Sequence, residues 1–163
     1  MAMADVDPER LSQSREILTK GGKINRSPDG TKHGNKVDVP PERQFIGLDA
    51  YRKVMEQDEV DVVILTTPPG FRPIHFEAAT RAGKHVFMEK PVAVDGPGVR
   101  KVLEGAKLAK EKNLKVGVGF NRRHSPLHET VINQIHEGKI GDLPLIRLYN
   151  CRSGVGKLSL IHI

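Results

Sequence analysis

The feature that most constrains the fold of this sequence is a regular alternation of short apolar runs with amphipathic stretches. The apolar runs, rich in β-branched residues, predict strands over residues 60–66, 84–88 and 114–120. The first run is continuous enough to predict a strand buried on both faces, as in parallel sheets. The amphipathic stretches predict helices over residues 71–82, 95–112 and 126–137.

Strands and helices that alternate at this spacing indicate right-handed βαβ units. They predict an α/β fold with an open, mostly parallel sheet and helices on both faces. The opening of the chain is less regular, and a last strand is expected near its end. These weaker segments are a strand ending at Asp5, a helix over 8–18, a polar loop over 19–44, an edge strand over 44–47, a helix over 48–56 and a strand over 143–150.

The sequence predicts the apolar face of one of these helices and the first residue of the next. Ile74, Ala78 and Ala82 fall on one stripe of the helix over 71–82, with Gly83 at its C-terminal end. Asp95 is placed as the N-cap of the next helix.

Composition limits the class of protein. A chain of 163 residues with 37% hydrophobic residues can bury the core of one ordinary domain. Its one cysteine, Cys151, excludes a disulfide framework and a multi-cysteine zinc site. No apolar run is long enough to span a bilayer, and no leader peptide opens the sequence, so we expect no membrane partner and favour a cytoplasmic location. An exported form stays open as the alternative, because we expect the true N-terminus to be missing.

The net charge of +6 raises the question of nucleic-acid binding. Single-stranded nucleic acids stack on aromatic side chains, but the chain has only five Phe, two Tyr and no Trp. The basic residues are not interleaved with these aromatics. We therefore expect a solvated basic surface and no nucleic-acid partner.

Polar residues follow three of the predicted strands, where ligands bind in open parallel sheets. Thr66, Thr67, Pro68 and Pro69 form a tight turn that can line a flat nicotinamide ring, although a simple turn between strand and helix explains these residues equally well. Asn121 and Arg122 follow the third strand and can hold a cofactor amide or an acidic substrate group. A basic start of the next helix is the alternative.

The tripeptide Glu89-Lys90-Pro91 is the sharpest local motif. A lysine beside a glutamate at the mouth of a parallel sheet, if partly buried, can exchange a proton with a substrate hydroxyl. Pro91 fixes the backbone, and a cis Lys90–Pro91 bond is compatible with the motif. The alternative is a surface ion pair at a strand end, which contributes little stability.

Asp5 is placed to bind the hydroxyls of an adenosine ribose, and its charge would repel a 2′-phosphate. That role favours NAD over NADP as cofactor. The alternative is an N-cap of the helix that begins at Pro8, or a plain turn acid. The glycine motif G-x-G-x-x-G, expected about 20 residues before such an acid, is absent from the sequence.

The histidines give no metal site. His124 and His128 are four residues apart, but no carboxylate or third histidine completes a ligand set. His75, one turn into a predicted helix, is as a lone histidine more often structural than a ligand.

These pieces in order resemble the glucose-fructose oxidoreductase, inositol dehydrogenase and MocA family (Gfo/Idh/MocA) of NAD(P)-dependent oxidoreductases. The motifs that carry the resemblance are Ala4–Arg10, Asp61–Pro69, His75, Ala82–Val86, Glu89–Pro91 and Gly119–Arg123. The resemblance implies a Rossmann-type, doubly wound domain, a second α/β domain, a sugar or polyol substrate and a homo-oligomer.

The resemblance also implies residue roles. Asp5 would bind the adenosine ribose, and Lys90 would be the catalytic lysine. The remaining implied cofactor contacts are Thr66, Thr67, Pro68, Pro69, His75, Glu89, Asn121 and Arg122. Relatives in the family include dehydrogenases, reductases and glycosidases that use bound NAD, and a non-catalytic nucleotide-binding Rossmann module is a further alternative.

The sequence departs from the family pattern at both ends. We expect residues 1–142 to be a partial Rossmann domain without its first strand and glycine loop, and 143–157 to begin a second domain. Residues 158–163 match the translation of CTG TCT CTT ATA CAC ATC, a transposon end used in sequencing libraries, and are expected to be an artefact. Such a fragment would have an unpaired sheet edge, bind NAD weakly and lack dehydrogenase activity.

Overall fold

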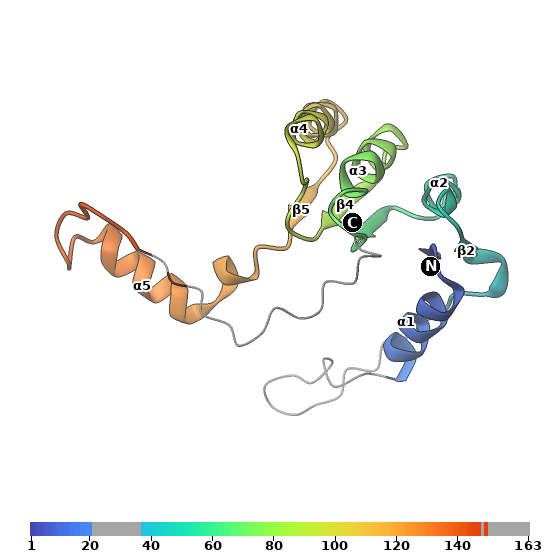
Figure 1. Cartoon of the computed structure of the whole chain (residues 1–163), viewed down its shortest axis with the longest axis horizontal. Helices are drawn as coiled ribbons and strands as arrows, with labels where there is room; N and C mark the ends of the chain where they lie inside the picture. The colour runs from blue at the N-terminus through green and yellow to red at the C-terminus, as the bar shows by residue number, and fades with distance from the viewer. Residues whose placement is uncertain (21–36, 148, 150–163) are drawn as a thin grey trace.

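The computed structural model describes residues 1–20, 37–147 and 149. Strands and helices alternate along the chain (Figure 1). The strands are β1 (Met3–Asp5), β2 (Gln44–Ile46), β3 (Val62–Leu65), β4 (His85–Met88) and β5 (Val116–Val118). The helices are α1 (Pro8–Lys20), α2 (Ala50–Met55), α3 (Arg72–Arg81), α4 (Gly96–Glu111) and α5 (Pro126–His136), with short 3-10 turns η1 (Pro41–Arg43) and η2 (Asn121–His124).

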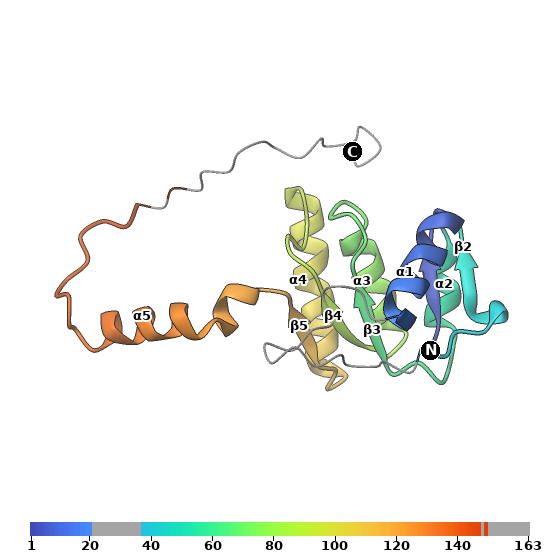
Figure 2. The same cartoon turned by 90° about the horizontal axis from the view of Figure 1, so that it is seen from below.

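All strand pairings in the described residues are parallel, which confirms the α/β fold expected from the sequence. The strands form two sheets, β1–β2 and β3–β4–β5. Val62 of β3 pairs with His85 of β4, and Val86 of β4 pairs with Val116 of β5. α2 contacts both β1 and α3 and so connects the two sheets, which lie next to each other in Figure 2.

The main core lies between the three-stranded sheet and helix α3. Its buried members are Met55, Val63, Leu65, Phe76, Ala79, Val86 and Met88. Side chains alternate along a strand, so Val63 and Leu65 point into this core while Val62 and Ile64 are 55% and 66% exposed. The prediction that this strand is buried on both faces is therefore wrong. In the part of the chain that the structure describes, the helices α3 and α4 lie together on one face of this sheet (Figures 1 and 2).

Helix α3 buries a different stripe from the one its apolar spacing predicted. Ile74 and Ala82 are exposed, whereas Phe76 and Ala79 are completely buried against the sheet and α4. Gly83 follows the helix with a φ of 75°, the left-handed conformation expected of a C-terminal glycine. Helix α4 begins as predicted, because the Asp95 side chain accepts a hydrogen bond from the Gly98 amide at 2.7 Å.

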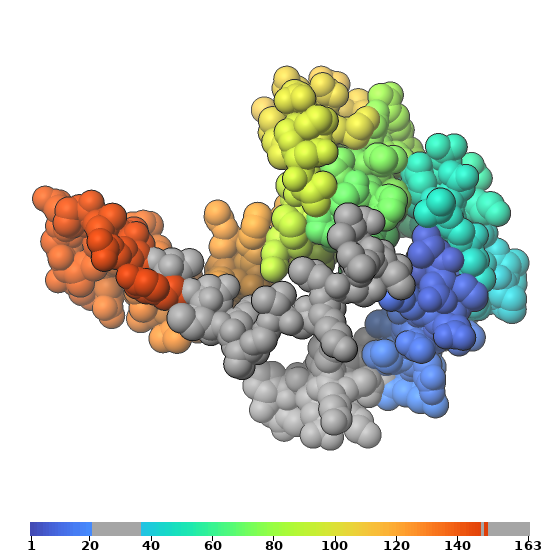
Figure 3. Space-filling model, viewed as in Figure 1, coloured from blue at the N-terminus to red at the C-terminus, as the bar shows by residue number. Residues whose placement is uncertain are grey.

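Helix α5 buries none of its residues and extends away from the two sheets as an arm, coloured orange in Figure 3. Its substantial contacts are with η2. The strand predicted over 143–150 is wrong for residues 143–147 and 149, which form no strand pairing. Residues 148 and 150–163, including the six-residue tail, lie outside the described part of the chain. In that part, every helix is too short or too polar to cross a membrane.

Candidate functional site

The carboxyl ends of β3, β4 and β5 meet at one edge of the three-stranded sheet. The Glu89 amide donates to the Leu65 carbonyl at 3.0 Å, and the Gly119 amide donates to the Met88 carbonyl at 2.9 Å. These bonds place the segments that follow the three strands side by side. The structure therefore gathers two of the predicted motifs, 66–69 and 89–91, at a single edge, where parallel α/β sheets bind their ligands.

The Glu89 side chain lies directly against the backbone at the end of β5. A methyl group added at Gly119 would lie 2.7 Å from Glu89 Oε1, closer than any normal contact, so the carboxylate can keep this position only beside a glycine. Its other oxygen accepts a hydrogen bond from the Lys90 amide at 3.2 Å. The carboxylate is thus held at the mouth of the sheet, between two strand ends.

The motif Glu89-Lys90-Pro91 has the backbone that its proline suggested, because the Lys90–Pro91 bond is cis. The partial burial that the sequence analysis set as a condition for proton exchange is not found, since Lys90 is exposed. Its exposed side chain is free to contact a molecule bound over the strand ends.

Thr67 is held by His75, which comes from the first turns of α3. The Thr67 hydroxyl lies 3.1 Å from His75 Nδ1, and the imidazole packs on the ring of Tyr51, with 4.3 Å between the ring centroids. Burial lowers the pKa of His75, and the positive charge of Arg72 lowers it further. The imidazole is therefore neutral near pH 7, so one of its ring nitrogens donates a hydrogen bond and the other accepts one. Sequence reasoning missed Tyr51, which carries no motif of its own.

Arg72, also missed from the sequence, lies beneath these loops and is only 3% exposed. Its Nη1 donates to the carbonyl of Pro91, and its Nη2 donates to the carbonyl of Thr67. One guanidinium thus connects the loop after β3 with the loop after β4. Arginine is rarely buried without a partner, so residue type alone gave no signal of this position.

Asp5 lies apart from this group, at the end of β1 in the other sheet. Its Oδ1 accepts a hydrogen bond from the Asp7 amide at 3.0 Å, which is the turn geometry of the alternative that the sequence left open. Its second oxygen has no such bond within the described residues, so the ribose-binding role stays a prediction.

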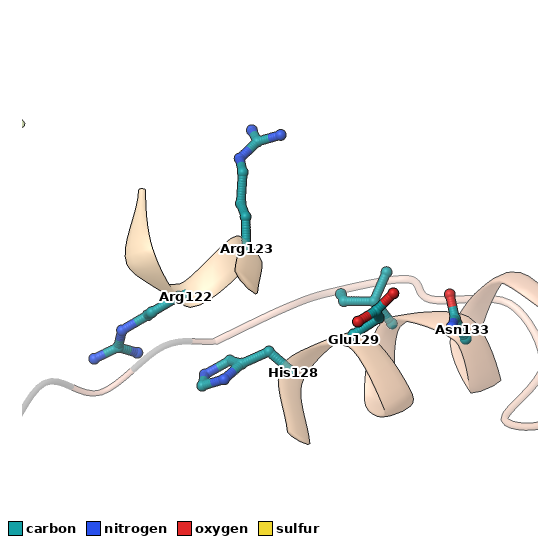
Figure 4. Close-up of a pocket in the computed structure, with 6 residues that line it drawn as sticks. Arg122, Arg123, His128, Glu129 and Asn133 are labelled. Carbon is teal, nitrogen blue, oxygen red and sulfur yellow. The ribbon is translucent and has the colours of Figure 1, made fainter. Parts of the chain in front are cut away.

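Asn121 and Arg122 belong to η2, between β5 and the arm, and both are exposed. A cavity of about 500 Å³ opens between η2 and α5. Arg122, Arg123 and His128 are among the residues that line it, and Figure 4 shows the Arg123 side chain leaving η2 in a different direction from those of Arg122 and His128. Among residues 1–20, 37–147 and 149, no three His, Cys, Asp or Glu side chains are grouped closely enough to hold a metal ion.

The groups at the carboxyl edge suit one end of a nicotinamide dinucleotide. A carboxylate, an ammonium and threonine hydroxyls can hydrogen-bond a ribose diol and a carboxamide, and the Thr67–Pro69 turn offers a surface for a flat ring. The diphosphate end has no matching glycine motif anywhere in the sequence. The fit is therefore to the nicotinamide and its ribose.

Comparison with known proteins identifies the family and agrees with the fold. Residues 27–120, more than half of the chain, match the model of the Gfo/Idh/MocA oxidoreductase family, which has an NAD-binding Rossmann fold. An inositol 2-dehydrogenase from Rhizobium meliloti is 34% identical over 55% of this chain and 26% of its own length. An inositol 2-dehydrogenase/D-chiro-inositol 3-dehydrogenase from Halalkalibacterium halodurans is 31% identical over 87% of this chain and 40% of its own length.

Solved structures show the same similarity. Apo scyllo-inositol dehydrogenase from Lactobacillus casei superimposes with a TM-score of 0.63 and 25% identity, covering 87% of this chain and 34% of the other. A 3-ketoreductase from Actinomadura kijaniata in complex with TDP-benzene and NADP gives a TM-score of 0.58 and 26% identity, covering 87% and 36%. The chain thus spans about a quarter to two fifths of the length of such relatives.

Proposed function

The chain belongs to the Gfo/Idh/MocA oxidoreductase family, and we propose that its carboxyl strand edge is the nicotinamide site of an enzyme acting on hydroxyl groups of a sugar or polyol. The observation that carries the proposal is the convergence of Thr67, Glu89 and Lys90 at this edge. In the alternating α/β fold, that edge is where a flat cofactor and a small polar substrate meet.

The chain's own residues then have distinct tasks. A bound nicotinamide cofactor supplies hydride acceptance in oxidation and hydride donation in reduction. Lys90 Nζ contacts the substrate oxygen, exchanges the hydroxyl proton during oxidation and returns a proton to the carbonyl oxygen during reduction. Glu89 bonds the nicotinamide ribose, and Thr67, oriented by His75, lines the ring.

NAD is the proposed cofactor in preference to NADP. The carboxylate of Asp5 at the end of β1 would bind the adenosine ribose and repel a 2′-phosphate. Relatives with either cofactor are known, since scyllo-inositol dehydrogenase from Lactobacillus casei was solved with NAD(H) and the Actinomadura kijaniata 3-ketoreductase with NADP.

The test uses the protein encoded by the native gene, assayed for reduction of NAD by inositols, glucose and related polyols. We expect Lys90→Ala to lower kcat by about 100-fold to 10,000-fold, because a positioned proton-transfer group contributes that much, and to leave the Kd for NADH largely unchanged. Lys110→Ala is the matched control, since Lys110 is an exposed lysine in the last turn of α4, at the opposite edge of the sheet. Turnover of Lys90→Ala near the wild-type level would contradict the proposal.

A second candidate is a glycosidase that uses bound NAD. A glycosyl hydrolase family 109 protein from Shewanella pealeana is 25% identical over 87% of this chain, which favours testing it. Release of nitrophenol from nitrophenyl glycosides without net NAD reduction would support the glycosidase. NADH binding with neither activity would instead indicate a non-catalytic nucleotide-binding module.

A further inference from the structure

Arg72 occupies an unusual position for a charged residue. It is 3% exposed, and in the described part of the chain its Nε, also buried, has no hydrogen-bond partner. No salt bridge joins it to a carboxylate among those residues. Removing a cation from water in this way is unfavourable, and the hydrogen bonds that Arg72 makes to backbone carbonyls offset that cost.

Those bonds connect the two loops that carry the site. Nη1 donates to the carbonyl of Pro91, the residue after Lys90, and Nη2 donates to the carbonyl of Thr67. A guanidinium presents its donors in a rigid planar fork, so its two ends fix two acceptors at a set separation. A lysine ammonium is a compact point charge without this fork, so we expect it not to hold both loops at that separation.

We propose that Arg72 is a positioning residue that sets the distance between the catalytic Lys90 and the ring-lining Thr67. The proposal rests on the function proposed above. Arg72 itself touches neither substrate nor cofactor; it acts through the backbone of the two loops. Thr67 is then held from two sides, by Arg72 at its carbonyl and by His75 at its hydroxyl.

A matched control separates positioning from ordinary stabilisation. Lys84 is also a buried cation, 8% exposed, and its Nζ donates to the Gln57 carbonyl at 2.8 Å. It precedes β4 and so lies at the amino edge of the sheet, away from the site. Lys84→Met and Arg72→Met each remove a buried cation that donates to the backbone, but only Arg72→Met removes a connection between the two loops.

The experiment measures turnover and backbone amide exchange in the wild type, Arg72→Met, Arg72→Lys and Lys84→Met. A displacement of about 1 Å between reacting groups lowers rate by about 100-fold, so we expect that loss in kcat for Arg72→Met with little change in the Kd for NADH. Arg72→Lys keeps the charge but should also lose turnover. Amides over 67–71 and 89–94 should exchange faster in both Arg72 variants and at the wild-type rate in Lys84→Met.

The outcomes distinguish the two proposals. A wild-type protein without turnover on any polyol or sugar overturns the proposed function and the positioning role with it. An active wild type whose Arg72→Lys variant turns over and exchanges like Lys84→Met overturns the positioning role alone. Loss of turnover and faster exchange confined to the two loops support it.

Discussion

Alanine at Gly119 and alanine at Gly105 would each bring a methyl group almost equally close to a neighbouring side chain. We nevertheless expect the first substitution to lower turnover and the second to lower stability. A methyl at Gly119 would lie 2.7 Å from Glu89 Oε1, and a methyl at Gly105 would lie 2.8 Å from Cε1 of Phe76. Neither glycine has a positive φ, so the alanine backbone itself is unstrained. What differs is whether the neighbour can move.

The magnitudes follow from that difference. Ordinary contacts need about 3.5–4.0 Å, so each neighbour must move by about 1 Å. The Glu89 carboxylate is the end of a flexible side chain, and rotating it costs about 0.5–1.5 kcal/mol, offset by about 0.4–1 kcal/mol of lost unfolded-state entropy. The Phe76 ring is completely buried, so Gly105→Ala should lower the free energy of unfolding by about 1–3 kcal/mol through overpacking. The higher helix propensity of alanine offsets about 1 kcal/mol of that loss.

The assay combines urea unfolding with turnover of both variants. Gly119→Ala should keep a near wild-type free energy of unfolding but lose about 100-fold in kcat, because the displaced carboxylate no longer lies at the mouth of the sheet. Gly105→Ala should unfold at lower urea and keep the wild-type kcat. The reasoning is refuted if Gly119→Ala is the less stable of the two, or if it turns over like the wild type.

Two further predictions concern charge. Because the pKa of His75 is lowered in the folded state, the unfolded state binds its proton more readily, so the free energy of unfolding should fall as pH drops below about 6.5, the ordinary value, towards the folded pKa. Urea unfolding at several pH values should show this pH dependence in the wild type, and the dependence should be weaker in His75→Gln. Equal pH dependence in the two proteins would contradict the prediction. Asp5→Ala should lower the ratio of kcat/KM for NAD to that for NADP by admitting the 2′-phosphate. Asp7→Asn, which alters the neighbouring acid that caps α1, serves as the control, and an unchanged ratio in Asp5→Ala would remove Asp5 from the site.

The elements of the fold could be predicted because they depend on local patterns. The β-branched runs, the N-cap at Asp95 and the glycine after α3 each have a nearest-neighbour cause, and each is found close to its predicted place. Burial depends instead on what covers a face. Val62 and Ile64 are as apolar as Val63 and Leu65, and nothing in their sequence says that only one face of the strand packs against a helix.

The motifs of the site could be predicted from the sequence, but the residues that hold those motifs in place could not. The carboxyl ends of parallel strands must share an edge, which is why the motifs of β3 and β4 meet. Arg72 could not be found, because arginine is most often a surface residue. Gly119 did leave a signal, since a glycine inside a strand often marks a close approach of another group, here Glu89. The strand expected over 143–150 failed because an apolar run forms a strand only where a partner strand is present.

The central claim is that the carboxyl edge of β3–β4–β5 binds the nicotinamide end of the cofactor. Titration of the isotope-labelled protein with NADH, followed by NMR, tests it without requiring tight binding or turnover. The claim predicts saturable shifts at the amides of Thr67, Glu89 and Lys90 and none at Lys84 or Lys110, at the opposite edge of the sheet. Shifts confined to that opposite edge, or no shifts at saturating NADH, would contradict it.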